Sequence, residues 1–302
     1  MSTKHTITFA GFLLAFVGSL FFSTKAIMVK YAFGDVKLDA VSLLALRMFY
    51  AVPMYAAVLF WLYRKERMPQ LKGREWIAVL GLGCMGYYVS SYLDFVGLQF
   101  VSAGLERLIL FLYPTFVLFI NHWFLKHKME RLQVMAIAIT YLGLFVAYAG
   151  EVAVVDVTPN FILGSVLIFL CAITYAIYIA GSGKIIPKVG ATAFTAYAML
   201  AASFGVLLHF FVSHPGQQAV LWNERYWIYG VLLSVVATVL PSFMISGAMK
   251  RIGSNNVAII SSIGPVSTIL QAHFILNEPI TVMQVLGTVL VIVGVLMLGR
   301  KK

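Results

Sequence analysis

Ten apolar stretches, each about as long as a membrane is thick, dominate this sequence of 302 residues. A hydrocarbon core of about 30 Å needs roughly 20 apolar residues in a helix. Hydrophobic residues make up 61% of the chain and charged residues only 11%, against roughly 25% charged in a soluble domain. We therefore predict an all-α integral membrane protein with ten transmembrane helices, near residues 8–29, 41–63, 75–98, 102–125, 130–149, 161–182, 190–212, 226–249, 254–276 and 281–299.

The second half of the chain repeats the first after a shift of 151 residues. Pro114 then matches Pro265, and Gly143 matches Gly294, without a gap between them. Each half holds five apolar stretches, and an odd number of crossings makes the second copy enter the membrane from the opposite side. We therefore expect two inverted five-helix repeats, residues 1–150 and 151–302, with tight turns at 99–102 and 250–253. Inverted repeats are typical of secondary transporters, which bind substrate near the bilayer midplane.

The basic residues indicate how the chain lies in the membrane. A net charge of +11 also fits nucleic-acid binding, but here the charges are scattered over short loops rather than gathered on one face. Most of the 22 Lys and Arg residues fall in segments that lie on one side if the N-terminus is inside. By the positive-inside rule both termini are cytoplasmic, and we expect a bacterial inner (plasma) membrane. The basic residues outside those segments are Lys25, Lys30, Lys37, Arg47, Arg107 and Arg225.

Two matched prolines interrupt the fourth and ninth predicted helices. Pro114 and Pro265 each lie about 12 residues into a span, near mid-bilayer at roughly 1.5 Å per residue. A proline removes one backbone donor and displaces the carbonyl four residues back, which is Ser261 for Pro265. Such carbonyls are tolerated in a membrane where protein, water or ligand satisfies them. The prolines are either the wall of a substrate cavity or packing kinks, and Ser261 either binds substrate or mediates helix packing.

Five ionisable residues lie at one depth, in the outer part of the predicted membrane: Lys25, Arg47, Asp94, Glu106 and Arg107. Charged residues within a membrane are costly and mark functional sites by default. Three cations against two carboxylates leave a surplus of about one positive charge, which could accept an anionic group of a substrate. Two other readings stay open: a closed salt-bridge network or gate, and long side chains that extend to the outer surface.

The remaining polar residues indicate binding rather than catalysis. Tyr113 and Tyr175 are candidates to line a binding site, because a tyrosine offers apolar surface with a polar end, although such residues also fill cores. Cys84 and Cys171 lie inside predicted helices, so we expect no disulfide framework. We find no metal-ligand cluster, phosphate-binding loop or nucleophile–base pair in the sequence, and expect neither enzyme activity, nor a metal, nor a cofactor.

The run Leu276-Asn277-Glu278-Pro279, followed by Gln284, Gly287 and Gly294, resembles the repeat signature of the EamA domain in the drug/metabolite transporter superfamily. The resemblance implies ten helices in two inverted units, a central cavity lined mainly by helices 1, 3, 4, 6, 8 and 9, and alternating access. One position departs from the pattern, because His127 stands where the first repeat should match Glu278. The first half is similar through Phe22-Ser23-Thr24-Lys25-Ala26, Leu46-Arg47-Met48, Asp94-Phe95-Val96-Gly97-Leu98 and Leu105-Glu106-Arg107-Leu108-Ile109.

We therefore expect a secondary transporter that exports amino acids or similar small metabolites. The expected partners are a small-molecule substrate and membrane lipid, and not nucleic acid. Two alternatives stay open: an uptake or exchange carrier for a larger metabolite such as a nucleotide derivative, and a non-transporting membrane component that acts through other proteins. The short loops offer little surface for such a protein partner, which weighs against the last reading.

Overall fold

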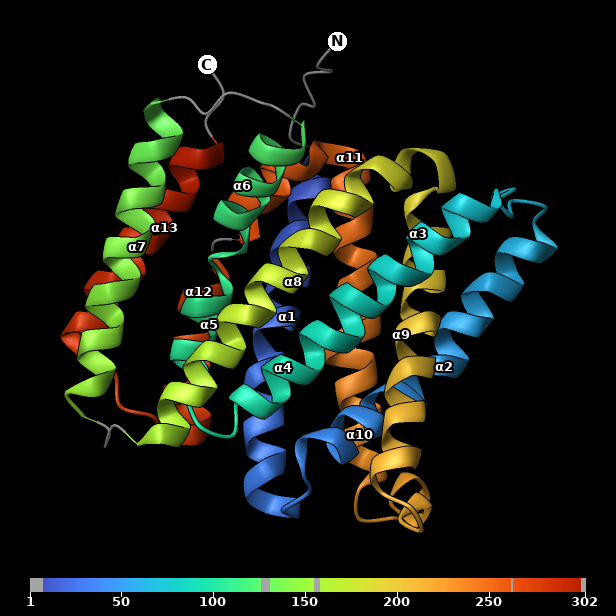
Figure 1. Ribbon diagram of the computed structural model, residues 1–302, viewed down its shortest axis with the longest axis horizontal. Helices are drawn as coiled ribbons and strands as arrows, with labels where there is room; N and C mark the ends of the chain where they lie inside the picture. Colours follow the sequence, from blue (N-terminus) through green and yellow to red (C-terminus); the bar gives the residue numbers. More distant parts are fainter. Residues whose placement is uncertain (1–7, 126–130, 155–157, 262, 300–302) are drawn as a thin grey trace.

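The computed structural model describes residues 8–125, 131–154, 158–261 and 263–299, which are almost entirely helical and contain no β-strand (Figure 1). The first half of the chain consists of α1 (Phe9–Val36), α2 (Ala40–Arg64), α3 (Gly73–Gly83), the π-helix η1 (Cys84–Val89), α4 (Ser90–Gly97), α5 (Ala103–Leu110), α6 (Tyr113–Leu125) and α7 (Arg131–Val152). The second half consists of α8 (Pro159–Val189), α9 (Ala191–Ser213), the 3-10 helix η2 (Gln218–Trp222), α10 (Trp227–Ser234), the π-helix η3 (Val235–Val239), α11 (Leu240–Ser261), α12 (Ile263–Leu276) and α13 (Val282–Gly299).

The helices are long and apolar enough for a protein that crosses the membrane many times. Among the described residues, 8 helical stretches could span a membrane by length and composition, and two shorter apolar helices follow them, Ile263–Leu276 and Val282–Met297. These stretches correspond to the apolar segments predicted from the sequence. The described part of the chain is therefore the helical bundle of an integral membrane protein.

One predicted connection is wrong. We expected a tight turn at residues 250–253, but the backbone there is helical, and α11 continues to Ser261. Glycine costs a helix only about 1 kcal/mol relative to alanine, and the next proline is Pro265. The sequence thus lacks a residue that would force the helix to end at Gly253. The other predicted turn is confirmed, because α4 ends at Gly97 and α5 begins at Ala103.

Local side chains set several helix starts. The Asp39 carboxylate accepts the first free N–H groups of α2, and the Ser102 hydroxyl accepts that of Leu105 in α5. Thr158 caps α8 in the same way, with Pro159 at the first helical position. These residues satisfy backbone donors that have no partner within the helix. Gly190 separates α8 from α9 at φ 84°, a backbone conformation that glycine adopts without strain.

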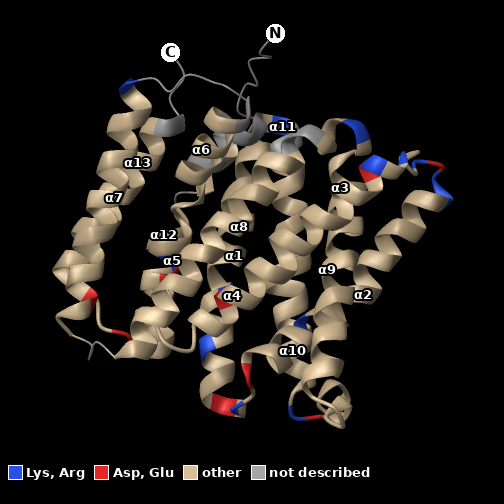
Figure 2. Cartoon of the chain, viewed as in Figure 1, with Lys and Arg blue, Asp and Glu red and all other residues tan. Residues whose placement is uncertain are grey.

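Helices of the two halves interleave. α1 packs against α11 and α12, α2 against α9 and α10, and α8 against α4 and α6. α7 and α13 pack together along one side of the bundle, and α1 begins at the same end of the bundle at which α13 finishes (Figure 1). The charged residues lie mainly at the two ends of the bundle, with few in between (Figure 2). The exceptions in the middle of the bundle form the candidate site.

Candidate functional site

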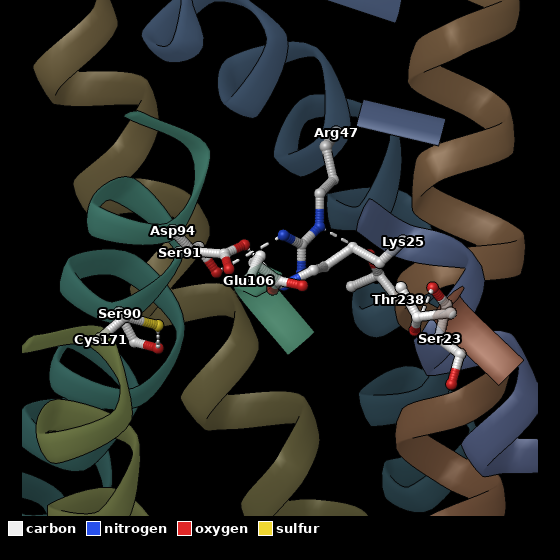
Figure 3. Close-up of polar contacts among 10 residues, drawn as sticks. Ser23, Lys25, Arg47, Ser90, Ser91, Asp94, Glu106, Cys171 and Thr238 are labelled. Atoms are coloured by element: carbon white, nitrogen blue, oxygen red, sulfur yellow. Dashed lines mark hydrogen bonds and ion pairs between the residues drawn. The ribbon is translucent and has the colours of Figure 1, made fainter. Parts of the chain in front are cut away.

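Lys25 lies between two buried carboxylates (Figure 3). Its Nζ is 2.5 Å from Asp94 Oδ2 and 3.4 Å from Glu106 Oε1. The Lys25 side chain is 12% exposed, while Asp94 and Glu106 are 1% and 0% exposed. The three residues come from α1, α4 and α5, so three helices of the first half are joined by one ammonium group. Ionisable groups this deeply buried do not extend to the outer surface, which excludes that reading for Lys25.

Arg47 lies beside this cluster but is held by other residues. Its Nε donates to Thr238 Oγ1 at 2.7 Å, and its Nη1 donates to Ser91 Oγ at 3.4 Å. The guanidinium also lies 5.5 Å from the centre of the Phe95 ring, a distance at which cation and ring attract each other. Arg47 is only 4% exposed, so it too fails to reach the outer surface. Because Thr238 belongs to η3, Arg47 connects the first half of the chain to the second.

Arg107 follows Glu106 in α5 and lies against a glycine of the second half. A Cβ on Gly264 would lie 2.8 Å from Arg107 Nη2. A larger residue at position 264 would therefore displace the guanidinium. The buried Nε of Arg107 has no hydrogen-bond acceptor among the described residues. Arg107 thus has hydrogen-bonding capacity that the described part of the protein leaves unused, next to Pro265.

The candidate tyrosines belong to a row of rings. Tyr113 contacts Tyr175 edge to face with ring centres 5.2 Å apart, and Tyr175 stacks on Tyr178 at 5.8 Å. Tyr178 in turn meets Tyr87, its hydroxyl donating to that of Tyr87 at 3.2 Å. The row joins α6 and α8 to η1. Edge-to-face pairs of this kind stabilise packing beyond the area they bury.

Small polar residues of α1 form a seam with the second half. Ser19 and Ser261 share a hydrogen bond of 2.7 Å, and Ser23 donates to the Gly264 carbonyl at 3.1 Å. Thr268 donates back to the Ser23 carbonyl at 3.3 Å. Ser261, the last residue of α11, thus contacts α1, and Pro265 is buried in the next helix, α12. Ser19 and Ser23 were not among the predicted site residues, although their four-residue spacing places both on one face of an apolar helix.

The helix break at the first proline is confirmed. α5 ends at Leu110 and α6 begins at Tyr113, so Phe111 and Leu112 form a turn immediately before Pro114. Thr115 donates its hydroxyl to the Leu112 carbonyl at 2.8 Å. A serine or threonine near a proline commonly satisfies backbone groups in this manner.

Two π-helical segments border the charged cluster. η1 (Cys84–Val89) ends one residue before Ser90 and Ser91, and η3 (Val235–Val239) contains Thr238. Their first residues are 151 positions apart, which is the shift of the sequence repeat. Single π-helical turns inside α-helices are frequent at functional sites. Gly86 lies within η1, and Pro241 follows η3 by two residues, but neither residue by itself predicts a π-helix.

Glu278 joins the two halves at the outer end of the predicted membrane. Its carboxylate oxygens accept the backbone N–H of Ala103, the first residue of α5, at 3.0 and 3.1 Å. Lys30 Nζ lies 3.3 Å from Glu278 Oε1 and donates to the Val101 carbonyl at 2.6 Å. A carboxylate at a helix N-terminus is favoured both by the free N–H groups and by the helix dipole. His127, the counterpart of Glu278 in the first repeat, lies outside the described residues.

Cavities of about 380 and 250 Å³ lie beside this contact. Both are lined by Lys30, Gln99 and Phe100, and the smaller is also lined by Glu151 and Glu278. Neither is lined by Pro114 or Pro265. A cavity wall formed by the prolines therefore stays a prediction.

Comparison with known families identifies the type of protein. The model of the EamA-like transporter family matches residues 9–149 and again residues 162–300. The chain belongs to the EamA-like transporter family. It is thus a membrane transporter, and the resemblance stated from Glu278 and its neighbours is confirmed.

Relatives of this EamA-like protein are named as transporters without a substrate. The uncharacterized transporter YcbK of Bacillus subtilis is 32% identical over 284 residues, 92% of this chain and 89% of YcbK. An uncharacterized transporter of Archaeoglobus fulgidus is 23% identical over 100% of this chain and 99% of its own length. A solved structure, titled only as the crystal structure of a protein, matches with a TM-score of 0.68 at 16% identity, covering 95% of each chain. That structure supports the fold alone.

Proposed function

We propose that this protein is a secondary transporter of the bacterial inner membrane that exports amino acids or similar small metabolites by alternating access. The observation that carries the proposal is the buried cluster of charges. Lys25, Asp94 and Glu106 lie together in an apolar bundle, with Arg47 and Arg107 beside them. Intramembrane ionisable residues that face a bundle interior mark substrate and ion pathways.

Alternating access fits two inverted repeats of five helices, residues 1–150 and 151–302. The two π-helices at equivalent positions support this arrangement. The packing of α7 against α13 also supports two inverted repeats. A Cβ on Gly143 would lie 2.7 Å from the Gly287 carbonyl, and one on Gly294 would lie 2.8 Å from the Ala136 carbonyl. The repeat shift converts the first contact into the second, as a two-fold relation between the halves requires. The family model also matches each half separately.

A small zwitterion fits the charges of the cluster. The unused Nε of Arg107 can donate to a substrate carboxylate, and the carboxylates of Asp94 and Glu106 can accept an ammonium group. The tyrosine row that includes Tyr113 and Tyr175 supplies apolar contact for a side chain. The helix break before Pro114 lies next to Tyr113. The buried Pro265 follows Gly264, against which the Arg107 guanidinium lies.

Solute flux tests the proposal directly. The purified protein, reconstituted into liposomes loaded with a mixture of labelled amino acids, should release label faster than protein-free liposomes do. Release of a labelled nucleotide derivative instead would favour the carrier for a larger metabolite. Absence of flux for both would favour the non-transporting membrane component.

The orientation leads to a prediction of its own. Because the basic loops are expected inside, reporter proteins fused after Lys188 and after Lys302 should both be active in the cytoplasm. A reporter fused near Gln217 should be active only outside. An external C-terminus would contradict the inverted arrangement, since both ends of a ten-helix chain lie on one side.

The matched prolines lead to a second prediction. Pro114→Ala and Pro265→Ala should each lower transport while the protein still inserts and folds, because a restored backbone hydrogen bond straightens the helix. Pro53→Ala in α2, a proline inside a helix without a repeat partner, serves as the control. Label efflux from liposomes measures the effect. Wild-type flux in both repeat variants would assign these prolines to packing alone.

A further inference from the structure

The two carboxylates of the cluster outnumber the cation that contacts them. Lys25 Nζ pairs with one oxygen of each, Asp94 Oδ2 and Glu106 Oε1. The other oxygens, Asp94 Oδ1 and Glu106 Oε2, are buried and receive no hydrogen bond from the described residues. Two buried carboxyl groups thus share one ammonium, and each keeps one oxygen that can carry a proton.

The neighbouring ionisable groups leave these oxygens unpartnered. The Arg47 guanidinium faces Asp94 but donates to Thr238 and Ser91. Arg107 follows Glu106 in α5, and its guanidinium lies against Gly264. From α8, the buried thiol of Cys171 shares a hydrogen bond of 3.2 Å with Ser90 Oγ. Among the described residues, the ionisable groups near the pair are thus Lys25, Arg47, Arg107 and Cys171.

A proton relieves the charge of this pair. Two carboxylates that share one ammonium in a low-dielectric site repel each other, and binding one proton removes this repulsion. With one proton bound, the pair carries a single negative charge against the ammonium of Lys25. The proton can bind Asp94 Oδ1 or Glu106 Oε2, the two oxygens that receive no hydrogen bond from the described residues.

We propose that the Asp94–Glu106 pair is a proton-binding site and that its proton is exchanged for the ammonium group of the exported substrate. This inference rests on the proposed export of a zwitterion. When the site faces the cytoplasm, the proton leaves to water and the substrate ammonium takes its place between the carboxylates. When the site faces outward, the substrate leaves, and a proton from outside forms the new O–H bond on the pair. Each cycle therefore carries one proton inward for one substrate molecule outward.

Infrared difference spectroscopy tests the proton site without any substrate. The purified protein in detergent, compared between acidic and alkaline pH, should lose a carbonyl signal of a protonated carboxyl as the pH rises. Glu106→Gln and Asp94→Asn should each lack this signal, and Glu106→Asp should shift it while keeping the pair. Glu151→Gln is the control, because Glu151 is a buried carboxyl of α7 outside the cluster, 6% exposed. An unchanged signal in Glu106→Asp and in every amide variant that folds would overturn the proposal.

A second measurement tests the exchange. Liposomes loaded with labelled amino acids should release label several-fold faster when the outside is made acidic, and Glu106→Gln should lose this stimulation. Equal release with and without the pH gradient in the wild-type protein would overturn the exchange. If the wild-type protein moves no amino acid at all, the proposed function fails, whereas the infrared result still decides whether the pair binds a proton.

Discussion

Replacing Lys25 by methionine is expected to lower the free energy of unfolding by about 3–5 kcal/mol, the cost of breaking a buried ion pair by removing one partner. The ammonium is the group that pairs with both Asp94 and Glu106, which are 1% and 0% exposed. Without the ammonium of Lys25, a negatively charged carboxylate is buried with no cation paired to it, or the two carboxyl groups must bind a further proton when the protein folds. Thermal and denaturant unfolding in detergent micelles measures the loss.

The exposed ion pair between Lys188 and Glu75 provides the control. Its atoms are 3.7 Å apart, and the side chains are 65% and 20% exposed. Lys188→Met should cost only about 0–1 kcal/mol, because water and salt screen the charges. The double variant Lys25→Met with Glu106→Gln should recover part of the lost stability, since it also removes one of the two carboxylates. Equal losses in Lys25→Met and Lys188→Met would show that the cluster is well hydrated rather than buried.

Replacing Arg107 by glutamine should weaken substrate binding roughly ten- to hundredfold, while the melting temperature stays close to that of the wild-type protein. The loss corresponds to a charge-assisted hydrogen bond of about 1.5–3 kcal/mol. Stability should change little because the buried Nε donates to none of the described residues. Arg107→Lys should restore binding only in part, since lysine lacks the planar fork that pairs with a carboxylate.

Arg47 is the matched comparison for Arg107. Its guanidinium donates to Thr238 and Ser91 and is 4% exposed. Arg47→Gln should therefore lower the melting temperature more than Arg107→Gln does. A thermal-shift screen of the purified protein against amino acids supplies the ligand, because a compound that binds the folded state raises apparent stability. Unchanged affinity in Arg107→Gln would exclude this residue from the substrate site.

Much of the site was predictable from depth alone. A helix advances by a constant rise per residue, so counting residues along each apolar stretch placed Lys25, Asp94 and Glu106 in one layer, and the structure joins them directly. The same counting could not pair the residues. Arg47 shares that layer, yet it bonds to Thr238, which is 191 positions away in the chain. The direction in which each side chain points around its helix depends on how the helices pack.

The end of α11 also shows what the sequence could and could not predict. Composition predicted where apolar helices lie, because crossing a membrane requires length and hydrophobicity of each segment by itself. It failed at residues 250–253, since glycine and polar residues permit a turn without enforcing one, and the helix continues to Ser261. The π-helices η1 and η3 were not predicted from the sequence either, because Gly86 within η1 and Pro241 after η3 permit a change of helix type without specifying it.

By itself, the sequence determined that the chain is an all-helical membrane protein with charges at a common depth, and its Glu278 motif indicated the family. These properties depend on the composition and spacing within single segments. Only the tertiary structure decided that Lys25 pairs with two carboxylates and that Arg47 donates to Thr238 of the second half. It also decided that Arg107 lies against Gly264, with an Nε that donates to none of the described residues. Each of these contacts joins helices that are far apart in the chain. How closely such helices pack, and how each is rotated about its axis, is decided only in the tertiary structure.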